Sequence, residues 1–149
     1  MIVDDNQYAC ALASAQLKSL GITQTKYVAS GAEALLCMQT ERYDVLLMDW
    51  YMPDVSGAGL LSVVRDQRFA GNSNIAVVVM TAYASSENIE RALSLGANEV
   101  VIKPIDPKSV GKAIAKALAE TQKQLATPAN DEFELDALPD DDEEGVALL

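Results

Sequence analysis

Three short apolar runs, at residues 45–48, 75–80 and 100–102, limit most strongly what this chain can fold into. They are continuous rather than alternating, and they are rich in β-branched residues. Such runs are typical of strands that are covered on both faces, as in a parallel sheet. Weaker strand signals at residues 2–3 and 25–28 bring the predicted number of strands to five.

Helical segments are predicted between and after these strands. Ser30 and Glu33 form a predicted capping box, and Asp106 precedes Pro107 at the start of the last helix. The predicted helices cover residues 6–20, a segment that starts at Ser30, and residues 57–67, 86–95 and 107–125. Five βα units of this kind indicate an α/β fold with a doubly wound parallel sheet, whose functional residues gather at the carboxyl ends of the strands.

The net charge of −11 is distributed unevenly along the chain. All eleven Lys and Arg residues lie between Lys18 and Lys123, whereas residues 127–149 contain nine acids and no base. We therefore predict one folded domain over residues 1–126 and an acidic, disordered tail over residues 127–149. The nearly neutral body and acidic tail have no basic footprint for a phosphate backbone, so we expect no direct binding of nucleic acid.

Several functional classes are excluded by residues that the chain lacks. It has no histidine, which removes Ser-His-Asp catalysis, His-ligated zinc and phosphohistidine donation. Its two cysteines, Cys10 and Cys37, have no metal-type spacing and suggest no disulfide framework. No apolar run approaches the roughly 18–20 residues of a membrane span, and the N-terminus does not resemble a signal peptide. We expect a cytoplasmic protein without membrane insertion.

Polar residues stand at the ends of four of the five predicted strands. Asp4 and Asp5 follow the first strand, Asp49 ends the third, Thr81 ends the fourth and Lys103 ends the fifth. Since the carboxyl ends of parallel strands share one edge, these five side chains should converge. Three clustered carboxylates repel one another, and a hard divalent cation relieves that repulsion. The pattern therefore predicts a Mg²⁺ site.

The same residues suit phosphoryl transfer. An ionised Asp49 is already a nucleophile and needs no general base, so the absence of histidine is no obstacle. Mg²⁺ and Lys103 can neutralise charge on the transferred group, and the Thr81 hydroxyl can donate a hydrogen bond to the product acyl phosphate.

Four sequence runs resemble the receiver domain of bacterial two-component response regulators. They are IVDDN (residues 2–6), LLMDWYMPDVSG (46–57), VMTA (79–82) and VIKP (101–104), and the likeness extends over about residues 1–124. The resemblance implies a flavodoxin-like (βα)5 fold with strand order 2-1-3-4-5. It points to a single-domain, chemotaxis-regulator-like protein.

The resemblance also implies roles for individual residues. Asp49 would accept a phosphoryl group from a histidine kinase or a histidine phosphotransfer protein. Asp5, Asp49 and the backbone carbonyl of Tyr51 would hold Mg²⁺, while Asp4 would act mainly through water. Thr81 and Lys103 would contact the phosphoryl group.

The family pattern further implies a cis peptide bond between Lys103 and Pro104. It also implies that the protein assists its own phosphorylation without being a conventional enzyme. No effector domain is recognisable after residue 127, so we expect output by protein–protein contact or by onward phosphotransfer.

The chain departs from the family pattern in three places. Only residues 1–3 precede the acid pair, and we expect that upstream residues are missing. Val100 stands where receivers commonly carry an aromatic ring that takes part in switching. Residues 9–15 have mostly small side chains, which fits either a helix that docks the phosphodonor or a helix packed tightly on the sheet.

Two rival functions would use parts of the same residue set. A haloacid-dehalogenase-like phosphatase needs a second acid two residues after its nucleophile, where this chain has Tyr51. A phosphorylation-independent interaction module is compatible with Val100 but leaves the acid set without a purpose.

The tyrosines at positions 51 and 83 are expected to flank the path of hydrolytic water and to prolong the phosphorylated state. The acidic tail suits a docking segment or a solubilising one.

Overall fold

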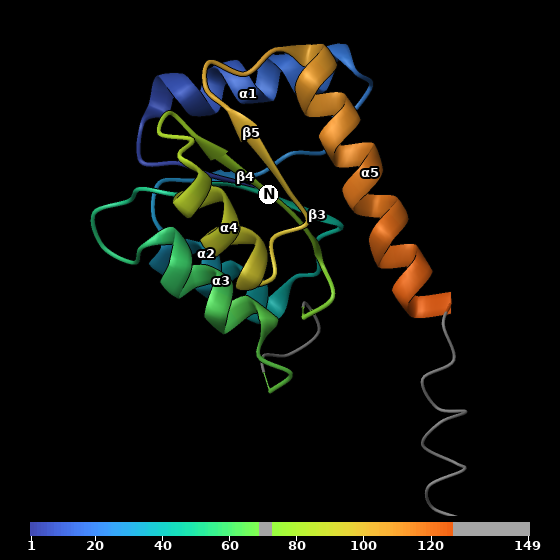
Figure 1. The fold of residues 1–149 in the computed structure, drawn as a ribbon. Coiled ribbons are helices and arrows are strands. Elements are labelled where there is room, and N and C mark those ends of the chain that lie inside the picture. The colour runs from blue at the N-terminus through green and yellow to red at the C-terminus, as the bar shows by residue number, and fades with distance from the viewer. Residues whose placement is uncertain (69–72, 127–149) are drawn as a thin grey trace, which may run out of the picture.

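The computed structural model describes residues 1–68 and 73–126, so the predicted tail at 127–149 lies outside the described residues. Within them, five strands alternate with five helices (Figure 1). The elements are β1 (Ile2–Val3), α1 (Gln7–Ser19), β2 (Tyr27–Val28), α2 (Gly31–Thr40), β3 (Val45–Asp49), α3 (Gly57–Arg65), β4 (Ala76–Thr81), α4 (Ser86–Ser94), β5 (Glu99–Ile102) and α5 (Pro107–Ala126).

The strands form one parallel sheet in the order β2-β1-β3-β4-β5, which confirms the predicted doubly wound topology. Val3 pairs with Met48, Met48 with Val79, and Val79 with Val100, so the four strands are aligned. The short first strand still reaches both neighbours: the Ile2 amide donates to the Lys26 carbonyl at 2.8 Å, and the Leu47 amide donates to the Met1 carbonyl at 2.9 Å.

Two apolar cores cover the two faces of the sheet. Leu46, Met48 and Val77 face a core that α2, α3 and α4 complete, whereas Leu47 and Val78 face a core that α1 and α5 complete. Figure 1 shows these two groups of helices on opposite sides of the sheet. The continuous apolar runs therefore have the cause that the sequence indicated, which is burial of successive side chains on both faces.

The predicted caps at Ser30 and Asp106 are present: the Ser30 side chain accepts the Glu33 amide, and the Asp106 side chain accepts the Ser109 amide. The Asn6 side chain, which was not predicted as a cap, accepts the amides of Tyr8 and Ala9. Glu33 reaches back to the amide of Ala29, one residue further than in the predicted capping box. In the part of the chain that the structure describes, no helix is both long enough and apolar enough to cross a bilayer.

Arg65, at the end of α3, ties three parts of the chain together. Its guanidinium donates to the carbonyl oxygens of Ser73, Ile75 and Gly96 at 2.6–2.9 Å, and to the Asn98 side chain at 3.0 Å. Burial lowers the pKa of Arg65, yet arginine stays charged in proteins. One side chain therefore links α3 to the segments that precede β4 and β5.

We predict that Arg65→Met lowers the free energy of unfolding by about 2–3 kcal/mol, because four oxygen acceptors lose a charged donor and some stay buried. Urea denaturation measures the change. Arg68→Met is the matched control, since the Arg68 side chain is 91% exposed and pairs with nearby Asp66. Equal losses of unfolding free energy in the two variants would contradict this stabilising role of Arg65.

Candidate functional site

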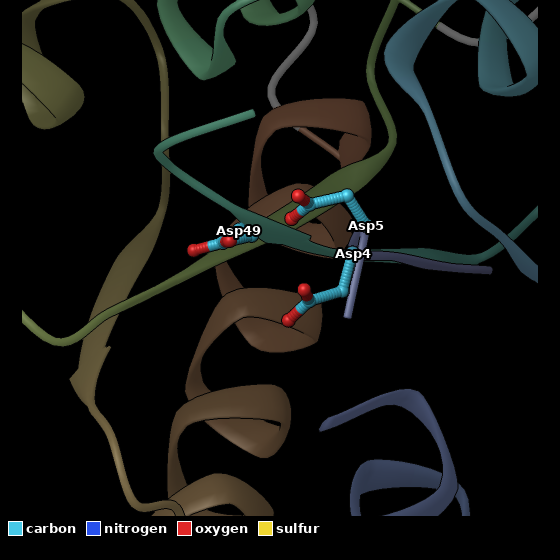
Figure 2. A group of neighbouring side chains, drawn as sticks. All are labelled: Asp4, Asp5 and Asp49. Atoms are coloured by element: carbon cyan, nitrogen blue, oxygen red, sulfur yellow. The ribbon is translucent and has the colours of Figure 1, made fainter. Parts of the chain in front are cut away.

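Three carboxylates meet at the carboxyl edge of the sheet. Asp4 and Asp5 directly follow β1, and Asp49 is the last residue of the adjacent strand β3. One oxygen from each lies within 4.8 Å of the others, and Figure 2 shows the three side chains around one shared space. Asp4 and Asp49 are buried at 1% and 8% exposure, whereas Asp5 is exposed.

Backbone groups orient the two buried carboxylates. The Asn6 amide donates to Asp4 at 2.9 Å, and the Trp50 amide donates to Asp49 at 2.9 Å. Gly57 allows the loop after Asp49 to close tightly, because a Cβ at that position would lie 2.7 Å from the Trp50 carbonyl oxygen. The loop between β3 and α3 is thereby held against the end of the strand.

Lys103 supplies positive charge to this cluster. Its ammonium nitrogen lies 2.7 Å from an Asp4 oxygen and 3.4 Å from an Asp49 oxygen. Its amide donates to the Thr81 carbonyl at 2.8 Å, which holds the end of β5 beside the end of β4. The peptide bond between Lys103 and Pro104 is cis, as the resemblance implied.

Burial raises the pKa of Asp49, and the nearby charge of Asp4 adds to this effect, while Lys103 opposes it. Desolvation alone would lower the pKa of Lys103, but its bonds to Asp4 and Asp49 outweigh desolvation and raise it. One ammonium thus faces three carboxylates in a confined space. This donor set of hard oxygen atoms with excess negative charge fits Mg²⁺.

Thr81 is buried at the end of β4, one position beyond the residue that pairs with Asp49. Its side-chain oxygen accepts the Tyr83 amide at 3.0 Å, which leaves its own proton available for donation. The structure therefore brings Asp4, Asp5, Asp49 and Lys103 into one cluster and places Thr81 at the same edge of the sheet.

Two tyrosines stand beside the acids, joined by a residue that the sequence reasoning missed. The rings of Tyr51 and Tyr83 meet edge to face with centroids 5.6 Å apart. The Asn88 side-chain nitrogen, from α4, donates to the Tyr51 hydroxyl at 2.8 Å and to the Tyr83 carbonyl at 3.0 Å. No sequence signal distinguishes Asn88 from an ordinary first-turn residue, because its bonds depend on how α4 packs.

Comparison with known proteins decides the family. Residues 1–115 match the family model described as the response regulator receiver domain. The chain belongs to the response regulator receiver family. Receivers are signalling modules of two-component systems, and the resemblance to receiver domains predicted from the sequence is confirmed.

Two relatives illustrate the breadth of this receiver's family. The chemotaxis protein CheY of Pseudomonas aeruginosa is 32% identical over 117 residues, which cover 78% of this chain and 92% of CheY. The transcriptional regulatory protein ZraR of Escherichia coli is 33% identical over 130 residues, which cover 87% of this chain. The match spans only 28% of ZraR, so the likeness concerns one part of that longer protein.

Among solved structures, the receiver domain of the sensor histidine kinase PA1611 from Pseudomonas aeruginosa matches with a TM-score of 0.70 and 26% identity. The match covers 79% of this chain and 94% of that domain. That structure holds a magnesium ion coordinated in its active-site cleft.

We predict that Asp49→Asn raises the melting temperature of this receiver at neutral pH in EDTA. The folded protein binds a proton at Asp49 more tightly than the unfolded chain does, so ionised Asp49 costs stability above its folded pKa. The gain should shrink as pH falls through that raised pKa towards the ordinary value of 3.8, because both states then protonate the carboxyl.

Thermal melts from pH 7 down to pH 4 measure this gain. Asp5→Asn is the control, and it should change the metal-free melt less because Asp5 is exposed. Added Mg²⁺ should stabilise the wild type more than Asp49→Asn, since a ligand stabilises the state that binds it. A metal-free melt that Asp49→Asn lowers at neutral pH would contradict the prediction.

Proposed function

We propose that this receiver is a cytoplasmic phosphoacceptor, phosphorylated on Asp49 in a Mg²⁺-dependent reaction by a histidine kinase or a histidine phosphotransfer protein. The observation that carries the proposal is the cluster of Asp4, Asp5 and Asp49 within 4.8 Å, with the Lys103 ammonium 3.4 Å from Asp49. Burying like charges together does not stabilise the edge of a sheet, so a purely structural role does not explain this cluster.

Asp5, Asp49 and the Tyr51 backbone carbonyl would hold Mg²⁺ directly. Both Asp4 oxygens already have partners, the Asn6 amide and the Lys103 ammonium, which supports a role for Asp4 through bound water. When bound, the ion supplies positive charge that offsets the negative charge of the carboxylates and of the phosphoryl oxygens.

In the proposed step, an Asp49 oxygen forms a bond to phosphorus while the phosphorus–nitrogen bond of the donor's phosphohistidine breaks. The electron pair of that bond returns to the imidazole nitrogen. Lys103 moves its ammonium from the carboxylates towards a phosphoryl oxygen, and the Thr81 hydroxyl donates to another. Asp49 needs no base, because the ionised carboxylate is the nucleophile.

The surface next to the acids supports docking of a donor. Tyr8 and Leu12 of α1 are 78% and 45% exposed. Leu12 also lines an apolar groove of about 310 Å³, together with Lys103, Pro104 and Ile105. A helix of the donor in this groove would bring its phosphohistidine next to Asp49.

A second candidate function is phosphorylation-independent binding of a partner protein. Val100 is partly buried against the core on the α2–α4 side, and it has no ring that could turn inwards on phosphorylation. We favour the phosphoacceptor because the acid set is complete, and we propose output by protein–protein contact or onward phosphotransfer. Uptake of phosphate from acetyl phosphate separates the two candidates.

We predict one added phosphoryl group per chain after incubation with acetyl phosphate and Mg²⁺, measured by intact-mass spectrometry. Asp49→Asn should abolish the addition, and Asp5→Ala should abolish both the addition and the Mg²⁺ response of Trp50 fluorescence. Trp50 is a suitable reporter because it is buried and its amide donates to Asp49. Asp66→Asn, at the C-terminal end of α3, is the control and should be phosphorylated normally. Undiminished labelling of Asp49→Asn would refute the assignment.

A further prediction concerns the lifetime of the phosphorylated state. Tyr51 and Tyr83 follow Asp49 and Thr81 by two residues, and their rings meet edge to face. Asn88 bonds to the Tyr51 hydroxyl and to the Tyr83 backbone carbonyl, so the pair should stay in place and shield the acyl phosphate from an in-line water. Tyr51→Asn, Tyr83→Ala and Asn88→Ala should each accelerate decay by about threefold to tenfold, a change of at most about 1.4 kcal/mol.

Decay of phosphorylated protein after removal of the donor measures this lifetime. Ser94→Ala is the control, because Ser94 lies at the far end of α4 and donates to the Arg91 carbonyl. Slower decay in both tyrosine variants would mean that the phenols assist the water, and shielding would be wrong.

A further inference from the structure

The outward face of α5 carries a stripe of lysines. Lys108, Lys112, Lys116 and Lys123 are all exposed, and we call them the lysine stripe. At 3.6 residues per turn their spacing places all four within an arc of about 80°. Figure 1 shows α5 at the outside of the molecule, in keeping with the exposure of the four lysines.

The acids near the stripe are occupied by other bonds. The Asp106 carboxylate accepts hydrogen bonds from the amide and the hydroxyl of Ser109, each at 2.9 Å. The bond from the amide, followed by the bond from the hydroxyl, lowers the pKa of Asp106. Glu120 accepts the Asn98 side-chain nitrogen at 2.9 Å. Glu99 lies 3.6 Å from Lys116, whose side chain remains 67% exposed.

Two lysines of the stripe form no salt bridge with the described residues, although the charge of Lys108 contributes to the lowered pKa of Asp106. Within residues 1–68 and 73–126, no carboxylate oxygen lies within 4.0 Å of the ammonium of Lys108 or Lys112. Such a row of like charges attracts a polyanionic segment, and the attraction falls with added salt.

The chain itself supplies such a segment. Residues 127–149 begin where α5 ends, and they carry nine acids and no base. Twenty-three residues reach up to about 75 Å when extended, whereas the 20 residues of α5 span about 30 Å. The acids at positions 140–144 can therefore reach back to Lys108.

We propose that residues 127–149 bind back along the lysine stripe of the same molecule and cover this face of α5. Covalent attachment gives the segment an effective concentration in the millimolar range, so weak ionic contacts suffice for occupancy. An acidic partner would have to displace the segment before it could use this face. The proposal does not depend on phosphorylation of Asp49.

The test compares amide NMR spectra of the full chain with those of a variant in which residues 140–144 are neutralised (Asp140→Asn, Asp141→Asn, Asp142→Asn, Glu143→Gln and Glu144→Gln). We expect shift differences concentrated in residues 108–123. Raising NaCl to 0.5 M should move the wild-type α5 amides towards the positions of the neutralised variant.

A matched pair of variants locates the contact. In Lys108→Gln/Lys112→Gln, neutralising residues 140–144 should no longer shift the α5 amides. Lys18→Gln/Arg42→Gln removes two exposed cations from other elements and should leave the effect intact. A synthetic peptide of residues 127–149 should bind the neutralised chain at least about tenfold more tightly than the wild type, because the wild-type stripe is already covered.

Three outcomes would overturn the proposal. In the first, neutralising residues 140–144 leaves the chemical shifts of the α5 amides unchanged. In the second, the shift change persists in Lys108→Gln/Lys112→Gln. In the third, the shift change grows with protein concentration. The last result would mean that a second copy supplies the segment.

Discussion

Parallel pairing of β3 between β1 and β4 is the constraint on which the rest of the structure depends. Four of its five residues are buried, and its neighbours on both sides run in the same direction. Their ends therefore share one edge, which places Asp4, Asp49 and Thr81 together without help from the loops. A slip of one residue in this register would turn the Asp49 side chain into an apolar core.

Electrostatic crowding at that edge is costly to the fold and useful to the site. Two buried carboxylates and a third beside them share one ammonium, which lies closer to Asp4 than to Asp49. Asp4 thus holds Lys103 in position, while Asp49 is left with a raised pKa and a weaker ion pair. A cation or a phosphoryl group that enters this space meets groups that are already oriented, which limits the reorganisation that binding requires.

Further side chains lie around this shared framework. Tyr51 and Tyr83 follow Asp49 and Thr81 by two residues, and Asn88 joins them to α4. Val100 is partly buried and packs against the core on the α2–α4 side. Charge is segregated as well, with exposed lysines along α5 and acids beyond it. The framework is that of the family, and the side chains at its rim set the individual behaviour.

The sequence by itself determined the five βα units, the caps at Ser30 and Asp106 and the residues at the strand ends, because apolar periodicity, capping residues and strand-end polar residues are local signals. Strand order followed from the resemblance, and the structure confirmed it. Only the tertiary structure decided which charges pair: Lys103 lies nearer to Asp4 than to Asp49, and Arg65 bonds to four oxygens from distant segments. Asn88 joined the site in the same way. Such contacts depend on how helices pack on the sheet, and no local pattern of residues encodes that geometry.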